Sequence, residues 1–269
     1  MSFQFSDRLT NEFYSQGFTV FRQISPPSLI ADLRRVTDEG RAIARAKKGA
    51  QVQRFQPVGV YEIDQKPFQD YAELPALCDA ISRVLSPAHV HGNPQIMGVL
   101  LEPQDLPYST AWHRDARNLI EDEDEWHELF YHYDNGNQVN CPLWEDSCTW
   151  FVPGSHLRAD LEQEKTAFPD FPPLPPVLEN LSHEERERIG LEFCAQMPGA
   201  VCLHLNAGDF ALYRPYGWHL GNYVPYKKRA TLHDGVWLPE SGERWMNRLK
   251  ELQALRDEKK KTTDAENKI

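Results

Sequence analysis

The chain has 269 residues, of which 41% are hydrophobic, and a formal net charge of −11. This acidic balance argues against nucleic acids and anionic membranes as main partners, and we expect neither. No apolar run approaches the roughly 18 residues that a membrane span needs, and the N-terminus has neither a basic leader nor an apolar stretch. The five cysteines form no CxxC pair, which excludes a zinc knuckle, and their odd number favours a reducing compartment. We therefore predict a cytoplasmic protein with one domain over residues 1–269 and leave its oligomeric state open.

The first part of the chain alternates helical patterns with short apolar runs. Residues 6–16 predict an amphipathic helix and residues 18–21 a strand. Pro26-Pro27 begins a long stretch with apolar residues at helical spacing, and a further helix is expected over 73–85. A strand is then predicted from about 95 to 101.

The later part is richer in strands. An acidic run begins at Glu121 and predicts a surface helix that continues to Tyr133, because acidic side chains favour a helix N-terminus. Strands are expected to dominate residues 200–238. The tail from Glu240 is predicted to be helical at first, then polar and frayed from about 257.

Residues 157–197 form the longest segment without a strand pattern. Prolines are frequent between 168 and 176, where they cannot continue a sheet. The segment predicts a loop with one short helix near 182–189, and long loops often cover a site. We expect it to act as a lid, with a passive surface insertion as the alternative.

Two short motifs about a hundred residues apart carry the metal chemistry that the sequence suggests. Trp112-His113-Arg114-Asp115 supplies an HxD pair, and Gly217-Trp218-His219 precedes Arg229 by ten residues. Side chains two apart on a strand share a face, so His113 and Asp115 can reach one ion. Two imidazoles and one carboxylate, with open positions on the metal, are typical of a non-haem Fe(II) oxygenase. HxD alone is frequent by chance, but its combination with His219 and Arg229 is a much stronger signal.

Four blocks in order extend this signal over most of the chain. They are Phe13-Tyr14-Ser15-Gln16-Gly17-Phe18-Thr19-Val20-Phe21, Trp112-His113-Arg114-Asp115, Phe151-Val152-Pro153-Gly154-Ser155-His156, and Ala207-Gly208-Asp209-Phe210-Ala211-Leu212-Tyr213 followed by His219, Asn222 and Arg229. In these blocks the chain resembles the phytanoyl-CoA dioxygenase family of Fe(II)/2-oxoglutarate-dependent oxygenases. The resemblance implies a mainly β fold with flanking helices, built on a double-stranded β-helix (a cupin-like jelly roll).

The resemblance also implies roles for individual residues. His113, Asp115 and His219 would be the catalytic iron ligands, and Arg229 would bind the distal carboxylate of 2-oxoglutarate. A guanidinium offers a planar fork that matches a carboxylate, which agrees with this role. Asn140 stands where family members carry a Trp, and we expect it to contact the cosubstrate.

Two further departures concern the cosubstrate site. The chain reads Leu101-Glu102-Pro103 where members often have Lys-Pro, and Gly221 stands where they often have a hydroxyl residue. Both departures put the secondary contacts to 2-oxoglutarate in doubt and leave the iron ligands unaffected.

The expected reaction is oxidation, such as hydroxylation, of an unactivated C–H in a small molecule, with Fe(II), 2-oxoglutarate and O2. Asp115 favours hydroxylation, because halogenating relatives have a small residue at this position. The alternatives are a non-catalytic binding or regulatory module that keeps the fold, and a cupin-like metalloenzyme that does not use 2-oxoglutarate.

Several residues near these motifs are ambiguous. His156 is expected to be structural. Arg114 and Arg117 could contact an anionic substrate group or could pair with the acidic run at 121–125. Asn222 is expected to cap a turn. The aromatic residues around the motifs are predicted to form core or pocket wall: Trp112, Tyr213, Tyr216, Trp218 and Tyr223.

Overall fold

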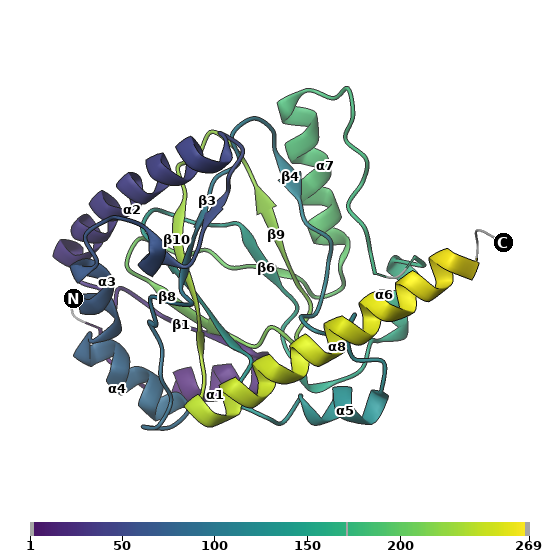
Figure 1. The fold of residues 1–269 in the computed structure, drawn as a ribbon, viewed down its shortest axis with the longest axis horizontal. Coiled ribbons are helices and arrows are strands. Elements are labelled where there is room, and N and C mark those ends of the chain that lie inside the picture. The colour runs from purple at the N-terminus through teal and green to yellow at the C-terminus, as the bar shows by residue number, and fades with distance from the viewer. Residues whose placement is uncertain (1–2, 171, 267–269) are drawn as a thin grey trace.

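The β core of the computed structural model, which describes residues 3–170 and 172–266, consists of two antiparallel sheets (Figure 1). The larger sheet has the strand order β1 (Phe18–Phe21), β8 (Phe210–Tyr213), β5 (Asn137–Pro142), β10 (Ala230–Val236), β3 (Gly98–Leu101) and β2 (Arg54–Phe55). The smaller sheet has the order β4 (Tyr108–Ser109), β9 (His219–Tyr223), β6 (Thr149–Phe151) and β7 (Val201–Cys202). From β3 to β10 the chain crosses repeatedly between the sheets, which confirms the expected jelly-roll core.

Helices flank this core on several sides. They are α1 (Asp7–Gln16), α2 (Pro27–Lys48), α3 (Lys66–Ala72), α4 (Pro75–Val84), α5 (Glu123–Glu128), α6 (Glu162–Ala167), α7 (His183–Gln196) and α8 (Pro239–Glu266), with 3-10 turns at Val58–Val60 and Ser155–Leu157. Helices α2, α3 and α4 lie together at one side of the sheets, and α7 lies at the other (Figure 1).

The larger sheet separates an apolar outer face from a polar inner face. On β10, Leu232 and Val236 are fully buried in the cluster that includes Leu33 and Val36 of α2. The alternate residues Thr231 and His233 therefore point to the opposite face, between the sheets. Burial of the outer face fixes the register, and a slip of one residue would exchange the two faces.

The segment 157–197 is more ordered than the sequence predicted, so the prediction of a loop with one short helix is wrong. It contains α6 and the whole of α7, which begins in a capping box formed by Ser182 and Glu185. Helix α7 packs on β4 and β9, and its Phe193 and Cys194 are buried there. Apolar contacts with the smaller sheet extend the helix beyond 189, so much of this segment is packed helix.

Most other predicted elements are confirmed. Helix α1 ends at Gly17, which adopts a φ of 86° and donates its N–H to the carbonyl of Phe13. The strand predicted at 18–21 is β1, and the acidic run caps α5 through the Asp122 side chain. Helix α5 ends at Glu128, short of the predicted Tyr133, and the sequence did not reveal α3.

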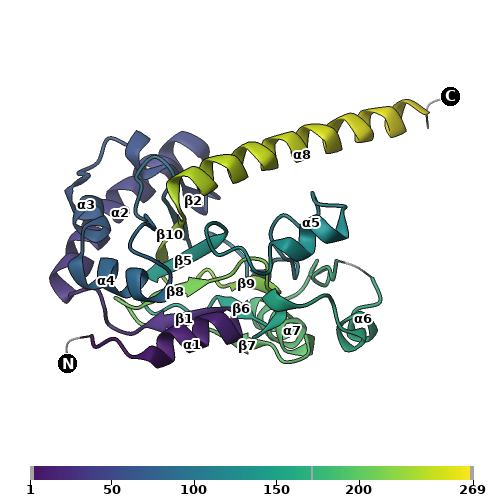
Figure 2. The ribbon, with the colours of Figure 1, turned by 90° about the horizontal axis from the view of Figure 1, so that it is seen from below.

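The tail does not fray where the sequence predicted. Helix α8 continues to Glu266 and crosses the molecule, with its C-terminal part extending beyond the β core (Figures 1 and 2). Two contacts hold its middle: Leu252 is buried beside Trp126, and Arg248 forms a bidentate ion pair with Glu125 of α5. Strong helix formers dominate this tail, which explains why a polar composition does not prevent a helix.

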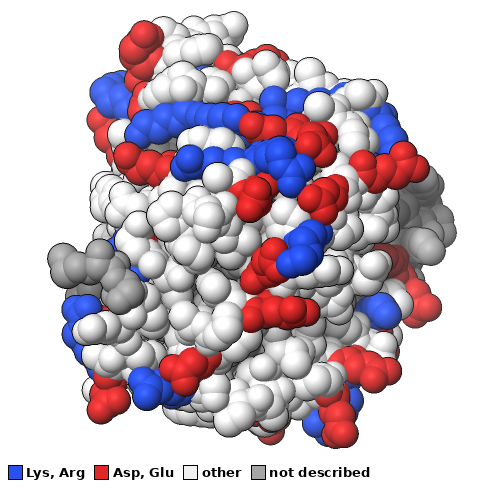
Figure 3. Space-filling view, turned by 90° about the vertical axis from the view of Figure 1, so that its left-hand side faces the viewer, with Lys and Arg blue, Asp and Glu red and all other residues white. Residues whose placement is uncertain are grey.

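Basic and acidic side chains are interspersed on the face that α2, α3 and α4 occupy (Figure 3). Among residues 3–170 and 172–266, we find no helix with the length and apolarity to cross a membrane.

Candidate metal centre

The structure brings together the three residues that the sequence proposed as iron ligands. Ligand atoms of His113, Asp115 and His219 all lie within 4.8 Å of one another. Asp115 Oδ1 is 3.5 Å from His113 Nε2 and 3.7 Å from His219 Nε2. Both imidazoles thus present Nε2 toward the same carboxylate oxygen.

Backbone carbonyls fix the orientation of both imidazoles. His113 Nδ1 is 2.9 Å from the carbonyl of Ala111, and His219 Nδ1 is 2.9 Å from the carbonyl of Gly217. A proton on Nδ1 satisfies each contact and leaves the Nε2 lone pair free for a metal. Burial and the neighbouring His113 lower the pKa of His219 to about 4, so this ring is neutral at physiological pH. The donor set of two nitrogens and one carboxylate therefore fits Fe(II).

A backbone bridge sets the distance between the two motifs. His113 and His219 exchange both backbone hydrogen bonds, each 3.0 Å long. Because the bridge pairs them directly across two antiparallel segments, their rings project to the same side, with centroids 4.2 Å apart. Residues His113 and His219, about a hundred positions apart in the sequence, are thus direct neighbours across two strands.

A chain of hydrogen bonds orients the carboxylate. The amide of Gln138 on β5 donates to Asp115 Oδ2. Gln138 Oε1 accepts in turn from the hydroxyl of Tyr213 on β8, at 2.9 Å. This leaves Asp115 Oδ1 directed toward the histidines. The sequence reasoning missed Gln138, although its position on the inner face of β5, two residues before Asn140, is the signal that could have identified it.

A cavity of about 390 Å³ between the sheets contains the three ligands and Arg229. Arg229 is buried, and its Nε donates to Asp146 Oδ2 at 2.8 Å. The Asp146 carboxylate also accepts from Thr231 at 2.6 Å. Within the described residues the two Nη groups of Arg229 form no hydrogen bond, so the outer edge of the fork is available in the cavity. The predicted partner of a carboxylate therefore lies in the same cavity as the metal ligands.

The two departures near Arg229 now have a structural explanation. Glu102 accepts the backbone N–H of Arg229 at 2.8 Å and pairs with Arg45 and Arg41, so it anchors the start of β10. A Cβ added at Gly221 would lie 1.9 Å from the hydroxyl of Tyr223. Residues 221 and 223 share a face of β9, and the Tyr223 hydroxyl fills the space beside Gly221.

Asn140 lines the same cavity, but its amide is already engaged. Its Nδ2 donates to Thr149 at 2.9 Å and its Oδ1 is 3.0 Å from Nδ1 of His233. It links β5, β6 and β10 across the cavity floor. Contact between Asn140 and the cosubstrate stays a prediction.

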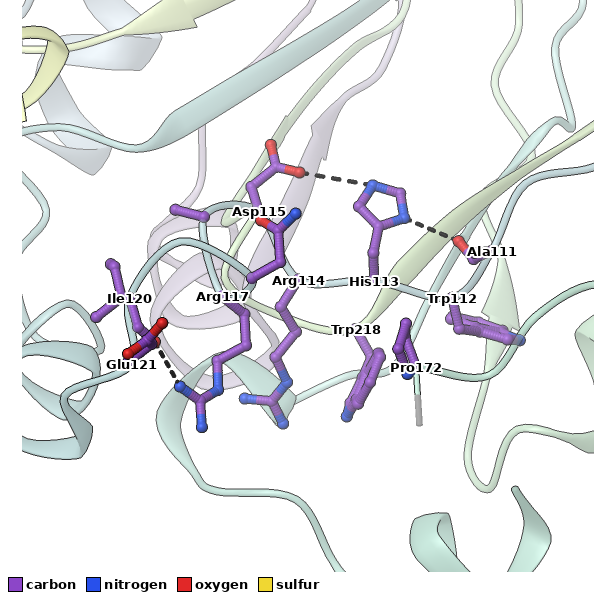
Figure 4. A pocket seen from close by; sticks show the side chains of 12 residues that line it. Ala111, Trp112, His113, Arg114, Asp115, Arg117, Ile120, Glu121, Pro172 and Trp218 are labelled. Carbon is purple, nitrogen blue, oxygen red and sulfur yellow. Dashed lines mark hydrogen bonds and ion pairs between the residues drawn. The ribbon is translucent and has the colours of Figure 1, made fainter. Parts of the chain in front are cut away.

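The opposite side of the HxD segment has a different character. Figure 4 shows the side chains of His113 and Asp115 on one side of this segment and those of Trp112, Arg114 and Trp218 on the other. A larger cavity of about 680 Å³ adjoins the HxD segment. His113 and Asp115 line both cavities, whereas His219 lines only the one between the sheets.

Arg114 and Arg117 both contact acidic residues. Arg114 is buried and pairs with Asp160 at 2.9 Å, while its guanidinium lies 5.2 Å from the ring of Trp218. Arg117 pairs with Glu123 in the acidic run. Both guanidinium groups have acidic partners within the protein, and both residues also line the cavity of about 680 Å³.

Other predicted residues lie apart from the metal. His156 is fully buried and packs against Gly17, where an added Cβ would lie 2.5 Å from its ring. Asn222 accepts from Ser109 at 2.9 Å and lies against Gly190 of α7, so it joins the smaller sheet to that helix.

Arg54 is a cavity residue that the sequence reasoning missed. It lies on β2 at the edge of the larger sheet and lines the cavity that holds the metal ligands. Within the described residues its guanidinium forms no hydrogen bond and no ion pair; burial lowers the pKa of Arg54, and the nearby Asp115 is among the groups that oppose this shift. No motif marks it, because it enters the site through strand pairing with Leu100.

Comparison with known proteins gives a match in structure but not in sequence. No family model and no curated protein matches the chain. The solved structure of AviO1 from Streptomyces viridochromogenes is similar, with a TM-score of 0.55, 14% identity, and coverage of 86% of this chain and 94% of that one. The epimerase SnoN, described as non-heme and alpha ketoglutarate dependent, has a TM-score of 0.52, 15% identity, and coverage of 86% and 80%.

A nickel complex of the non-heme monooxygenase ThoJ has a TM-score of 0.54, 16% identity, and coverage of 86% of this chain and 77% of that one. At these identities the likeness concerns the fold. The chain shares the jelly-roll fold of these proteins over most of its length.

Proposed function

We propose that this protein is an Fe(II)/2-oxoglutarate-dependent oxygenase that oxidises an unactivated C–H of a small molecule. The observation that carries this proposal is the presence of two imidazoles, a carboxylate and a fork-bearing arginine in one cavity between the sheets. The names of two structural neighbours, a non-heme alpha ketoglutarate dependent epimerase and a non-heme monooxygenase, support the same chemistry. They also differ in reaction, so the fold does not choose among oxidations.

The protein's own groups would bind and orient both small molecules. His113, Asp115 and His219 would hold Fe(II), which together with 2-oxoglutarate and O2 supplies the oxidising chemistry. The free edge of Arg229 would bind the distal carboxylate of 2-oxoglutarate. Asp146 holds Arg229 in place by its ion pair, and both side chains are buried.

Asp115 also bears on the type of oxidation. Its carboxylate fills the third protein position beside the histidines, and Gln138 holds it there. A halide would need that position to be vacated. We therefore propose oxygen insertion or a related oxidation over halogenation.

A cupin-like metalloenzyme without 2-oxoglutarate is the second candidate. Such an enzyme would not need a buried arginine in the metal cavity, and the contacts of Arg229 therefore favour the 2-oxoglutarate enzyme. A purely binding or regulatory module is the third candidate, and the intact ligand set argues against it.

The direct test is formation of succinate from 2-oxoglutarate by purified protein, with and without Fe(II). We expect slow succinate formation that requires Fe(II) and is lost in Asp115→Ala. Asp124→Ala removes an exposed carboxylate of the nearby acidic run and should behave as wild type. Iron binding without any succinate, across a panel of small-molecule substrates, would contradict the proposal and favour the second candidate.

A further inference from the structure

A second cavity of about 520 Å³ adjoins the one that holds the metal ligands. The two cavities share Arg54, Gln138 and His233 in their linings. Arg229, just before β10, and His233 on its inner face line the first cavity. His233, Gly235 and, just after β10, Trp237 line the second. The two cavities thus follow one another along the same strand, with the metal cavity at the Arg229 end.

The second cavity is mainly apolar. Its wall includes Trp237 after β10, Trp245 and Met246 from the beginning of α8, and Val90 and Ile96 from the loop before β3. Val90, Ile96 and Met246 remain 42%, 44% and 52% exposed, which is unusual for three large apolar side chains around one groove. A concave, mainly apolar surface with polar groups at defined places is typical of a small-molecule site.

Arg54 stands where the two cavities meet. The other arginines near the metal motifs have acidic partners: Arg229 has Asp146, Arg114 has Asp160 and Arg117 has Glu123. Arg54 has no such partner within the described residues, and its side chain is exposed in the cavity walls. Acidic residues in the second cavity are not bonded to it, and Asp234 instead accepts the backbone N–H of Gly92.

An unpaired guanidinium beside an apolar groove is complementary to an amphipathic anion. Arginine binds carboxylates through a planar fork, and a hydrogen bond to a charged group contributes about 1.5–3 kcal/mol, or roughly 10- to 150-fold in affinity. The cosubstrate already has Arg229 for its distal carboxylate and the metal for its keto acid end. Arg54 is therefore left for another anionic group.

We propose that the substrate is a small carboxylate with an apolar body, held with its carboxylate at Arg54 and its body in the groove between α8 and the end of β10. This inference rests on the proposed function for the chemistry at iron and for the assignment of Arg229 to 2-oxoglutarate. The preference for an anion itself depends on Arg54 and the groove.

The test compares two probes that differ only in charge, naphthalene-2-acetate and naphthalene-2-acetamide. Each is titrated by calorimetry into protein with Fe(II) and 2-oxoglutarate in the absence of oxygen, and into protein without either. We expect the carboxylate to bind roughly 10-fold or more tightly than the amide. Arg54→Gln should remove this preference, and Trp245→Ala should weaken both probes alike.

Arg8→Gln serves as the control, because Arg8 is an exposed arginine on α1 with a side chain that is 76% accessible. It should keep the preference for the carboxylate. Equal binding of the two probes to wild type, or binding of neither, would overturn the proposal. A loss of 2-oxoglutarate affinity in Arg54→Gln would also overturn it, because that result assigns Arg54 to the cosubstrate.

The metal-free titration separates this proposal from the proposed function. If the protein forms no succinate but still prefers the carboxylate, the oxygenase assignment fails and the anion site stands. If succinate forms but the protein shows no preference for the carboxylate, the oxygenase assignment stands and the anion site is ruled out.

Discussion

The two sides of the HxD and GWH segments differ although they are built from alternate residues of the same chain. One side presents His113, Asp115 and His219 to a cavity of about 390 Å³ with polar walls. The other side presents Trp112, Arg114 and Trp218, which are 0%, 4% and 2% exposed. The larger cavity of about 680 Å³ is lined by His113 and Asp115 but not by His219, so cavity size alone does not identify the reaction site.

Alternate residues of these segments therefore serve different purposes, packing on one side and candidate metal binding on the other. Trp112 and Trp218 belong to the cluster that receives Phe193 of α7, and that packing holds the segment in place. The alternate side chains are then free to leave their polar atoms unpaired toward a metal. We expect substitutions on one side to affect chemistry and substitutions on the other to affect stability.

The most direct way to break the comparison is a pair of alanine variants. Asp115→Ala should lose Fe(II)-dependent succinate formation by more than the roughly 100-fold that loss of an outer partner costs a metal site. Its thermal midpoint should stay close to wild type, because Asp115 buries little apolar surface. Trp218→Ala should lose about 3–5 kcal/mol of unfolding free energy, while the folded protein still binds iron. A destabilised Asp115→Ala together with a stable but inactive Trp218→Ala would contradict this assignment of the two sides.

Arg229→Lys tests the far end of the metal-side cavity. Lysine keeps the charge but cannot offer a fork, so affinity for 2-oxoglutarate should fall by roughly 10- to 150-fold. The measurement is the 2-oxoglutarate dependence of succinate formation, with the exposed neighbour Lys227→Arg as control. Unchanged affinity in Arg229→Lys would show that another basic residue binds the cosubstrate.

Gln138→Leu sharpens the comparison within the metal side. It removes the donor to Asp115 Oδ2 but leaves all three ligands in place. Affinity for Fe(II) should fall by about 10- to 100-fold, measured by competition with a chelator. Tyr213→Phe removes only the hydroxyl that anchors Gln138 and should have a smaller effect in the same direction. A larger effect in Tyr213→Phe than in Gln138→Leu would be inconsistent with this order of contacts.

A further prediction concerns the two faces of β10 and affects stability alone. Burial raises the pKa of Asp234, on the outer face, to about 6. The folded state therefore holds this proton more tightly than the unfolded chain, whose Asp has a pKa near 3.9. The contribution to stability is complete below about pH 4 and declines as the pH rises to about 6, by at most about 3 kcal/mol.

Asp234→Asn should remove this decline, because an amide keeps an acceptor for Gly92 and carries no charge. The measurement is urea unfolding of both proteins between pH 4 and pH 7. If the free energies of unfolding of wild type and variant differ by the same amount at every pH in this range, Asp234 does not titrate as described.

The sequence identified the three candidate metal ligands because their spacing and residue types are local properties of two motifs, and the structure brings them together. The jelly roll was predicted from the resemblance carried by four blocks in order, and the sheets confirm it. The sequence did not reveal Arg54 or Gln138, because their places in the cavity arise from strand pairing across the sheets. The length of α7 was also missed, since tertiary packing of Phe193 against the smaller sheet extends a helix of mixed composition.

The close contact between Gly221 and Tyr223 constrains how this site could change over evolution. A side chain at position 221 would collide with the hydroxyl of Tyr223 at 1.9 Å and with the ring carbon that carries it at 2.2 Å. Loss of the hydroxyl alone would therefore not make room. A side chain at 221 therefore requires a smaller residue at 223. The effect of a substitution at 221 depends on what stands at 223: it should be harmful beside tyrosine and tolerated beside a small residue.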